Sequence, residues 1–348
     1  NRLSGATRTG TYPFSQSYGY DLNNNRTSIT KDGTATSATY DAANQMTSLG
    51  GTGYSYDRNG NLTAFGSNSL NYDESNKWVS GTVNGNDVTF GYDGFGRRSS
   101  RTVGTGRIDY WYDVTGLTLQ TGATNATFLR DQSGSVRSIT SGGATHNYGK
   151  DRLGSVTAMV ATDGTVARTY SYDPWGETIG ITGTAYNPFL FTGTYKDGAT
   201  GLYQMGARYY QSASGRFTQQ DPLPDSILSF NRYAYANCNP ANGIDPTGLL
   251  TAECQAAVVD LIGLFAGTVA GGLGKYLVEA LISQFFSVLS VAVAGAQNQG
   301  SDPLGAALNL LNVLVSPLTL IPGIGQGVTL VVGLVSSGYS LGLCVASL

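Results

Sequence analysis

The chain contains the segment Tyr56-Asp57-Arg58-Asn59-Gly60-Asn61-Leu62-Thr63, whose pattern recurs and indicates the architecture. Its aspartate can accept backbone N–H bonds within a tight turn, and its glycine can supply the left-handed backbone that such a turn needs. Short alternating apolar runs beside turns of this kind favour strands. The stretch therefore predicts a strand that ends in tyrosine, a tight turn and a returning strand.

The same Tyr-Asp pair, or an aspartate in the same setting, recurs through the first half of the chain. The aspartates are Asp21, Asp41, Asp57, Asp73, Asp93, Asp113, Asp131, Asp151 and Asp173, at spacings of 20, 16, 16, 20, 20, 18, 20 and 22 residues. One such hairpin cannot bury a face, whereas hairpins stacked side by side share a sheet whose tyrosines pack against neighbouring units. We therefore expect a mainly β repeat array in which these residues are scaffold.

Composition limits the chemistry that this chain can perform. The 348 residues carry 20 basic and 23 acidic side chains, a net charge of -3, so we expect no nucleic-acid partner. One histidine and three cysteines are too few for a His/Cys zinc site or a multi-bridge disulfide framework. Asp21-Leu22-Asn23-Asn24-Asn25 begins like a calcium loop, but Arg26 stands where that loop requires glycine. We therefore expect no metal and no cofactor.

The composition changes sharply at Leu250. The last 99 residues hold five charged side chains, which are Glu253, Asp260, Lys275, Glu279 and Asp302. The residues before Leu250 are rich in Gly, Ser, Thr, Asn, Tyr and Asp. This change predicts a separate C-terminal domain over residues 250–348.

The Tyr-Asp pattern resembles the YD repeats of the RHS family, which includes bacterial polymorphic toxins and the C subunits of insecticidal toxin complexes. The resemblance covers about residues 10–249 and becomes most specific from Tyr148 to Leu249, where a series of motifs appears in the order of the RHS-associated core. The motifs are Tyr148-Gly-Lys-Asp-Arg-Leu-Gly-Ser-Val156, Tyr172-Asp-Pro-Trp-Gly176, Gly201-Leu-Tyr203, Gly206-Ala-Arg-Tyr-Tyr210, Gly215-Arg-Phe-Thr-Gln-Gln-Asp-Pro222, Asn231-Arg-Tyr-Ala-Tyr235, Asn237-Cys-Asn-Pro240 and Asp245-Pro-Thr-Gly-Leu249.

The resemblance implies a spiralling β-hairpin shell over residues 1–180 and a core over residues 181–249 that plugs one end. It further implies a variable C-terminal segment, usually a toxin kept inside the shell. Family shells have more repeats than this chain, and the sequence starts in mid-pattern without Met. We therefore expect a C-terminal part of a longer protein and a partial cocoon.

In family members that process themselves, the core is an intramolecular aspartyl protease. Carried over to this sequence, the candidate carboxylates are Asp221 and Asp245, and the cleaved bond is Leu249-Leu250. Such chemistry needs two carboxyl groups that cannot both ionise, so that one is a general acid while the other activates water.

Two arginines in matched motifs, Arg216 and Arg232, are candidates for stabilising the oxyanion or holding a carboxylate. The sequence does not choose between them. The alternative is that Asp221-Pro222 and Asp245-Pro246 only initiate turns in an inert plug.

The C-terminal segment contains four long apolar stretches. They run over residues 256–274, 276–295, 304–321 and 328–345, and all approach the roughly 20 residues that a membrane-spanning helix needs. This predicts a small hydrophobic α-helical domain, either a cargo that inserts into a target membrane or a packed domain held by the shell. A Cys254–Cys344 bridge is compatible with the second alternative, and no enzymatic toxin is indicated there.

The sequence therefore predicts a secreted or bacterial cell-surface protein whose shell holds its own C-terminal segment as cargo. Release would follow self-cleavage after Leu249, and an immunity protein is an expected partner. The alternative is a surface repeat protein for adhesion or carbohydrate binding, with a core that does not cleave.

Overall fold

The computed structural model describes residues 2–222 and 231–249. All of these except Pro222 belong to one compact unit, Asn1–Asp221 with Asn231–Leu249. The C-terminal helical domain expected over residues 250–348, with its candidate Cys254–Cys344 bridge, lies outside the described residues. Within them, no helix is long and apolar enough to cross a membrane.

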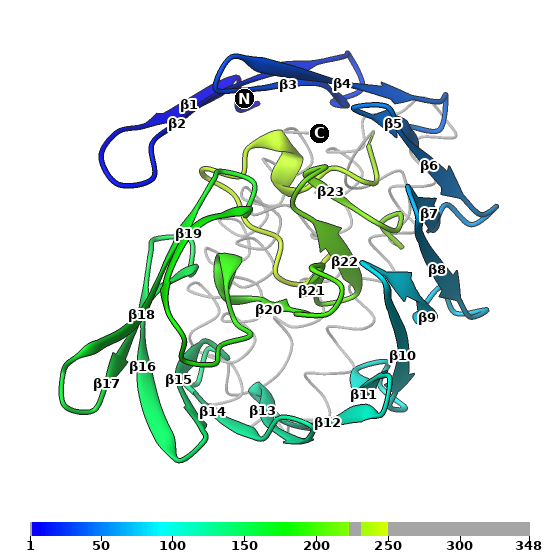
Figure 1. Cartoon of the computed structure of the whole chain (residues 1–348). Helices are drawn as coiled ribbons and strands as arrows, with labels where there is room; N and C mark the ends of the chain where they lie inside the picture. Colours follow the sequence, from blue (N-terminus) through cyan, green and yellow to red (C-terminus); the bar gives the residue numbers. More distant parts are fainter. Residues whose placement is uncertain (1, 223–230, 250–348) are drawn as a thin grey trace, which may run out of the picture. The chain divides into compact units, whose positions relative to one another are not determined.

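A single antiparallel sheet of 19 strands forms the wall of this unit, and each strand pairs with the next along the chain (Figure 1). The strands are β1 (Gly5–Arg8), β2 (Phe14–Tyr20), β3 (Arg26–Lys31), β4 (Thr34–Tyr40), β5 (Met46–Leu49), β6 (Thr52–Tyr56), β7 (Leu62–Phe65), β8 (Asn68–Tyr72), β9 (Trp78–Val83), β10 (Asn86–Tyr92), β11 (Arg98–Val103), β12 (Gly106–Asp113), β13 (Gly116–Gly122), β14 (Ala126–Arg130), β15 (Val136–Ser141), β16 (Ala144–Lys150), β17 (Val156–Ala161), β18 (Val166–Tyr172) and β19 (Thr178–Gly183). The expected mainly β hairpin shell is confirmed.

The repeated turns have the structure that the sequence predicts. In the turn at Asp57, Oδ1 accepts the N–H groups of Asn59 and Asn61 at 2.9 and 2.8 Å. Gly60, three residues after the aspartate, has φ +79°, and Asn24 holds the equivalent place at φ +62°. A side-chain oxygen thus satisfies the backbone donors of the turn, while a residue that tolerates left-handed backbone closes it.

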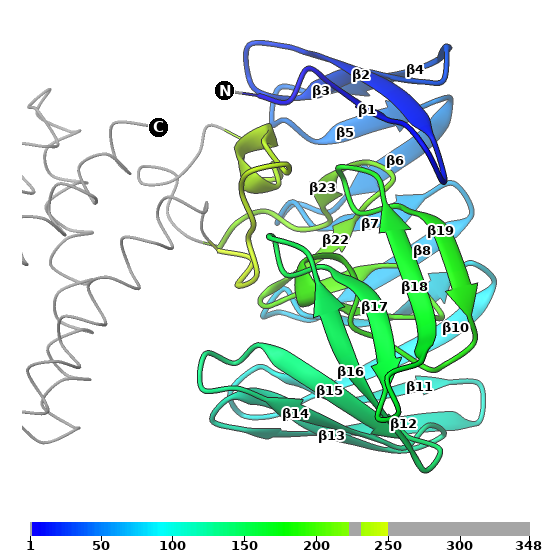
Figure 2. The same cartoon turned by 90° about the vertical axis from the view of Figure 1, so that its left-hand side faces the viewer.

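A bulge precedes each of these turns, which the sequence pattern alone does not reveal. The register shifts between Ser55 and Tyr56, and again between Gly91 and Tyr92. A bulge bends its strand and strengthens the local twist. Because the same irregularity recurs from unit to unit, the sheet curls, as Figure 1 shows from one end and Figure 2 from the side.

The repeat tyrosines join each unit to the one before it. Their hydroxyls donate to main-chain carbonyl oxygens of the preceding unit, namely Tyr40 to Arg26 at 2.8 Å, Tyr92 to Trp78 at 2.7 Å, Tyr112 to Arg98 at 2.9 Å and Tyr172 to Val156 at 2.7 Å. Burial raises the pKa of the Tyr112 phenol to about 12. The tyrosines are therefore scaffold that carries a hydrogen bond as well as packing area.

The two ends of the curled sheet meet through side chains. Gln16 Nε2 donates to Asp173 Oδ2 at 3.3 Å, and Lys31 forms ion pairs with Asp173 and Glu177. The Arg26 guanidinium lies 4.3 Å from the centroid of the Trp175 ring. Among the described residues, no ladder pairs β1 with β19, so these side chains close the turn of the wall.

A second, four-stranded sheet occupies the inside of the curl (Figure 1). It consists of β20 (Tyr195–Lys196), β21 (Tyr203–Met205), β22 (Arg208–Gln211) and β23 (Arg216–Phe217), with the short 3-10 turns η1 (Phe191–Gly193) and η2 (Ala236–Cys238) beside it. We call residues 184–222 and 231–249 the plug. Its fully buried rings pack on one another, with Tyr210 and Tyr235 centroids 4.6 Å apart.

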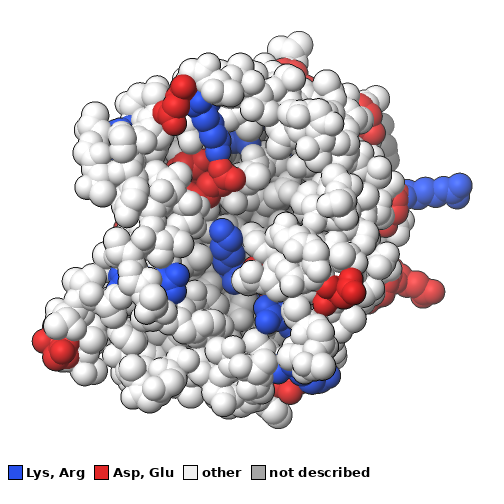
Figure 3. All heavy atoms as spheres, viewed as in Figure 1, with Lys and Arg blue, Asp and Glu red and all other residues white. Residues whose placement is uncertain are grey.

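Charge is sparse on the face seen in Figure 3, where most atoms belong to uncharged residues and the centre is hollowed. One buried carboxylate pairs with two arginines of the wall. Asp197, fully buried on the plug, accepts from Arg98 of β11 at 3.3 Å and from Arg101 at 3.0 Å. This triad fastens the plug to the wall.

Candidate functional site

Asp221 and Asp245 come together in the plug although 24 residues separate them in the sequence. Asp221 follows β23, and Asp245 lies in the last described segment, after η2. Oδ2 of each carboxylate contacts the same atom, Nη2 of Arg208, at 3.1 Å and 2.9 Å respectively. Because both oxygens contact one nitrogen, they can be at most about 6 Å apart.

Arg208 is the residue that sequence reasoning missed. It begins β22, is 3% exposed, and also donates through Nη1 to the carbonyl oxygen of Arg232 at 2.9 Å. Its guanidinium lies over the ring of Phe217, with Cζ 3.6 Å from the ring centroid. Burial lowers the pKa of this guanidinium, and Asp221 and Asp245 oppose that shift.

A signal for Arg208 was present in the sequence. It stands in the matched motif Gly206-Ala-Arg-Tyr-Tyr210, where two aromatic residues follow it directly. A buried arginine needs carboxylate or carbonyl partners, because an unpaired buried charge is strongly destabilising. An arginine that two aromatic residues follow therefore indicates a carboxylate or carbonyl partner elsewhere in the fold.

Arg232 supports the main chain at Asp221. Its Nε and Nη2 both donate to the Asp221 carbonyl oxygen, the former at 2.9 Å. The Asp221 N–H in turn donates to the Arg232 carbonyl oxygen at 3.0 Å. This reciprocal contact holds the backbone that carries the first carboxylate.

Arg216 lies at a different place, on the boundary between plug and wall. Its guanidinium donates to the Asn25 and Asn231 side chains at 3.0 and 3.3 Å and to the Asn44 carbonyl oxygen at 2.5 Å. It also lies over the ring of Tyr40, 4.8 Å from the centroid. These contacts tie β23 to the turns of the early repeats, so the structure does not bring Arg216 to the carboxylate pair.

The candidate cleavage site adjoins the second carboxylate. The Leu249 N–H donates to Asp245 Oδ1 at 3.2 Å, and Thr247 Oγ1 donates to the same oxygen at 3.3 Å. Asp245 is buried, whereas Leu249 is half-buried. Leu250, on the far side of the candidate bond, lies outside the described residues.

The site is therefore two carboxylates and one guanidinium, with the guanidinium over the Phe217 ring and a main-chain segment beside Asp245. Its charges are largely removed from water, where electrostatic interactions are stronger. Across residues 2–222 and 231–249, no group of three His, Cys, Asp or Glu side chains has an arrangement that could hold a metal ion.

Comparison with known proteins places this architecture in a family. The family model described as Teneurin YD-shell matches residues 3–241. The tRNA3(Ser)-specific nuclease WapA of Bacillus spizizenii is 33% identical over 249 residues, which cover 66% of this chain and 11% of that protein. Toxin protein Tse5 of Pseudomonas aeruginosa is 40% identical over 85 residues, which cover 24% of this chain and 6% of Tse5.

Among solved structures, the TcdB2-TccC3-Cdc42 crystal structure is similar, with a TM-score of 0.46 and 18% identity over 68% of this chain and 17% of that one.

The chain spans about a tenth of the WapA protein and a smaller share of Tse5. It belongs to the YD-shell family, and the resemblance to RHS proteins with YD repeats is confirmed.

Proposed function

We propose that this chain is part of an RHS-type toxin whose plug cuts the chain after Leu249. The released segment, residues 250–348, is a hydrophobic cargo directed at a target membrane. The observation that carries the proposal is the single nitrogen, Nη2 of Arg208, that contacts both Asp221 and Asp245.

The two carboxylates divide the chemistry of peptide hydrolysis. One acts as a base and takes a proton from water, whose oxygen attacks the Leu249 carbonyl carbon. The other, starting protonated, gives its proton to the departing nitrogen of Leu250, so that the products are a Leu249 acid and a Leu250 amine. Asp245 accepts from Arg208, Thr247 and the Leu249 amide, and these donors suit the ionised base.

Arg208 contributes by position, because one nitrogen holds both carboxyl groups within about 6 Å of each other. Its charge favours the ionised form of a carboxyl group beside it, while repulsion between the two carboxylates opposes the second ionisation. Arg232 holds the main chain of Asp221 through its carbonyl oxygen and is therefore a positioning residue.

The cargo part of the proposal rests on sequence. Residues 303–348 hold no charged side chain, and the four apolar stretches after Leu250 approach the length of membrane spans. Because the chain is similar to a toxin protein, we also propose that it is secreted or lies on the cell surface and that an immunity protein binds it. The nuclease activity in the WapA name belongs to that protein, and the near absence of basic side chains after Leu249 gives no support for it here.

Intact-mass analysis of the full chain tests self-cleavage. We expect two fragments that meet at Leu249-Leu250, and one uncut chain for Asp221→Asn and for Asp245→Asn. Asp109→Asn, which changes an exposed carboxylate on the wall, is the matched control and should cleave normally. A single uncut wild-type chain would remove the protease and leave the plug structural.

Vesicle leakage tests the cargo separately. The full chain after self-cleavage should release dye from anionic vesicles, whereas the uncut Asp221→Asn chain should not. Equal leakage by both proteins would disconnect membrane activity from release.

A further inference from the structure

The two-residue turn between β21 and β22 contacts the candidate cleavage segment directly. Met205 and Arg208 are opposed in the hairpin, and Gly206 and Ala207 join them. The Ala207 N–H donates to the carbonyl oxygen of Thr247 at 2.9 Å. The next residue, Arg208, contacts the two carboxylates. One turn therefore touches the segment to be cut and fixes the arginine of the site.

Two glycines make this contact possible. A Cβ on Gly206 would lie 2.1 Å from the oxygen and 2.4 Å from the carbon of the Thr247 carbonyl. A Cβ on Gly248 would lie 2.3 Å from the Met205 carbonyl oxygen. Both residues also have left-handed backbone, at φ +54° and +66°. The atoms in the way are main-chain atoms, which cannot swing aside as a flexible side chain does.

We propose that the Gly206-Ala207 turn is a main-chain clamp that sets the position of the segment ending at Leu249 beside the carboxylate pair. This inference rests on the proposed self-cleavage. The clamp holds the Thr247 carbonyl through one hydrogen bond. It requires glycine at position 248, because a Cβ there would clash with the Met205 carbonyl oxygen. Gly206 and Gly248 are thus positioning residues. Both must be glycine because the main chains of the turn and of the cleavage segment approach too closely for a Cβ atom.

The test compares Gly206→Ala with Gly201→Ala in the full chain. Gly201 lies in the same plug sheet, between β20 and β21, and has φ +73°, so alanine meets similar backbone strain there. Its added Cβ would find nothing closer than 3.7 Å, from the Asn84 side chain. Gly206→Ala should slow first-order self-cleavage by roughly 10²-fold, the effect of an ångström-scale misplacement. Gly201→Ala should cleave at nearly the wild-type rate.

The pH profile separates a clamp from a change in the charged groups. Gly206→Ala should lower the rate by one factor at every pH, with the inflections of the wild-type profile retained. Gly248→Ala should lower the rate in the same way. Because Gly248 lies in the cleavage segment and not in the hairpin, the same result there could not be explained by misfolding of β21–β22. Wild-type rates in both variants would overturn the clamp.

Hydrogen exchange in the uncut Asp221→Asn chain tests the clamp without relying on cleavage. Adding Gly206→Ala should speed amide exchange in residues 245–249, while exchange in wall strands β9 and β10 matches that of the Gly201→Ala chain. Unchanged exchange in residues 245–249 would overturn the clamp. If the wild-type chain proves uncut, the proposed function fails, and this exchange comparison still decides whether the turn holds the segment.

Discussion

Arg98 of the wall and Asp197 of the plug form an ion pair at 3.3 Å in which both side chains are almost wholly buried. Arg101 contacts the other oxygen of the same carboxylate, and the Arg98 guanidinium lies between 4.7 and 5.4 Å from the ring centroids of Tyr110, Tyr195 and Phe90. The Arg98–Asp197 pair is thus buried where the plug meets the wall.

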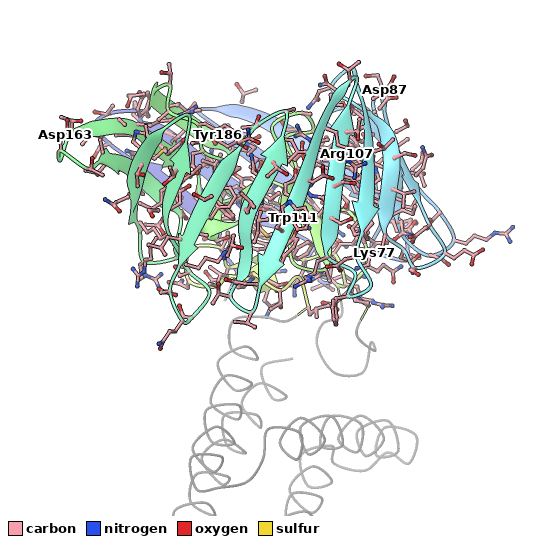
Figure 4. All side chains as sticks on the ribbon, turned by 90° about the horizontal axis from the view of Figure 1, so that it is seen from below. Lys77, Asp87, Arg107, Trp111, Asp163 and Tyr186 are labelled. Atoms are coloured by element: carbon pink, nitrogen blue, oxygen red, sulfur yellow. The ribbon has the colours of Figure 1, made fainter. Side chains whose placement is uncertain are left out.

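Asp197→Asn should therefore destabilise the protein by about 3–5 kcal/mol, because it leaves buried guanidinium groups without their counter-charge. Urea unfolding of the full chain measures this loss as a shift of the midpoint. Asp109→Asn breaks an Arg–Asp pair on the outer face of β12, where Figure 4 labels its partner Arg107, and should change stability much less because water screens that pair. Equal effects of the two substitutions would contradict the role of the triad.

The repeat tyrosines provide a second prediction. Tyr112→Phe removes the hydrogen bond to the Arg98 carbonyl oxygen and should lower the free energy of unfolding by about 1 kcal/mol. Tyr170→Phe is the comparison, because its hydroxyl donates to the weak acceptor Sδ of Met159 at 3.7 Å and we expect a smaller loss. Urea midpoints of both variants give the comparison, and a larger loss for Tyr170→Phe would count against the tyrosine ladder.

High pH should unfold this protein because burial raises tyrosine pKa values. The pKa rises from 10.0 to about 12 for Tyr54 and Tyr112, with burial as the main cause at both. The folded form therefore keeps a proton that the unfolded form loses. The stabilisation is complete below pH 10 and is lost as the pH rises towards 12.

Absorbance at 295 nm and urea midpoints at several alkaline pH values measure this effect. We expect stability to fall steadily above pH 10, with a group of tyrosines that ionises only on unfolding. Normal titration of every tyrosine near pH 10 in the folded chain would contradict the buried ladder.

The roles of two arginines can be separated by substitution with lysine. Arg208→Lys keeps a charge but loses the planar fork, so we expect self-cleavage to slow by about 10²–10³-fold. Arg216→Lys breaks contacts with Asn25 and Asn44, so we expect lower stability and cleavage near the wild-type rate. Time courses of intact mass, beside urea midpoints, resolve the two. A cleavage defect confined to Arg216→Lys would return the catalytic role to that residue.

Local features of this protein could be predicted because their causes are local. The turn at Asp57 depends on a carboxylate within four residues of the amides that it accepts, and Gly60 supplies the left-handed backbone. The spacing of the aspartates predicts hairpins of similar length, and hairpins that cannot bury a face alone must pair in series. The bulge before each turn was not predicted, because the Tyr-Asp pattern shows where a unit recurs but not how its two strands are aligned.

The candidate site was only partly predictable. The matched motifs predicted Asp221, Asp245 and cleavage after Leu249. They did not distinguish Arg216 from Arg232 as the arginine of the site, and they did not indicate Arg208. The choice between arginines depends on which side chain is buried against both carboxylates, and β22 lies 13 residues before one and 37 before the other.

Amino-acid order alone therefore determined a serial β-hairpin wall, its turn chemistry and the change in composition at Leu250, since these follow from contacts within one repeat or from composition. Tertiary structure alone decided that Arg208 joins Asp221 to Asp245, that Asp197 locks the plug to Arg98, and that the Gly206 turn meets Thr247. These residues are distant in sequence, and they meet because the curled wall surrounds the plug. The buried charges among them need partners, since an unpaired buried charge is strongly destabilising.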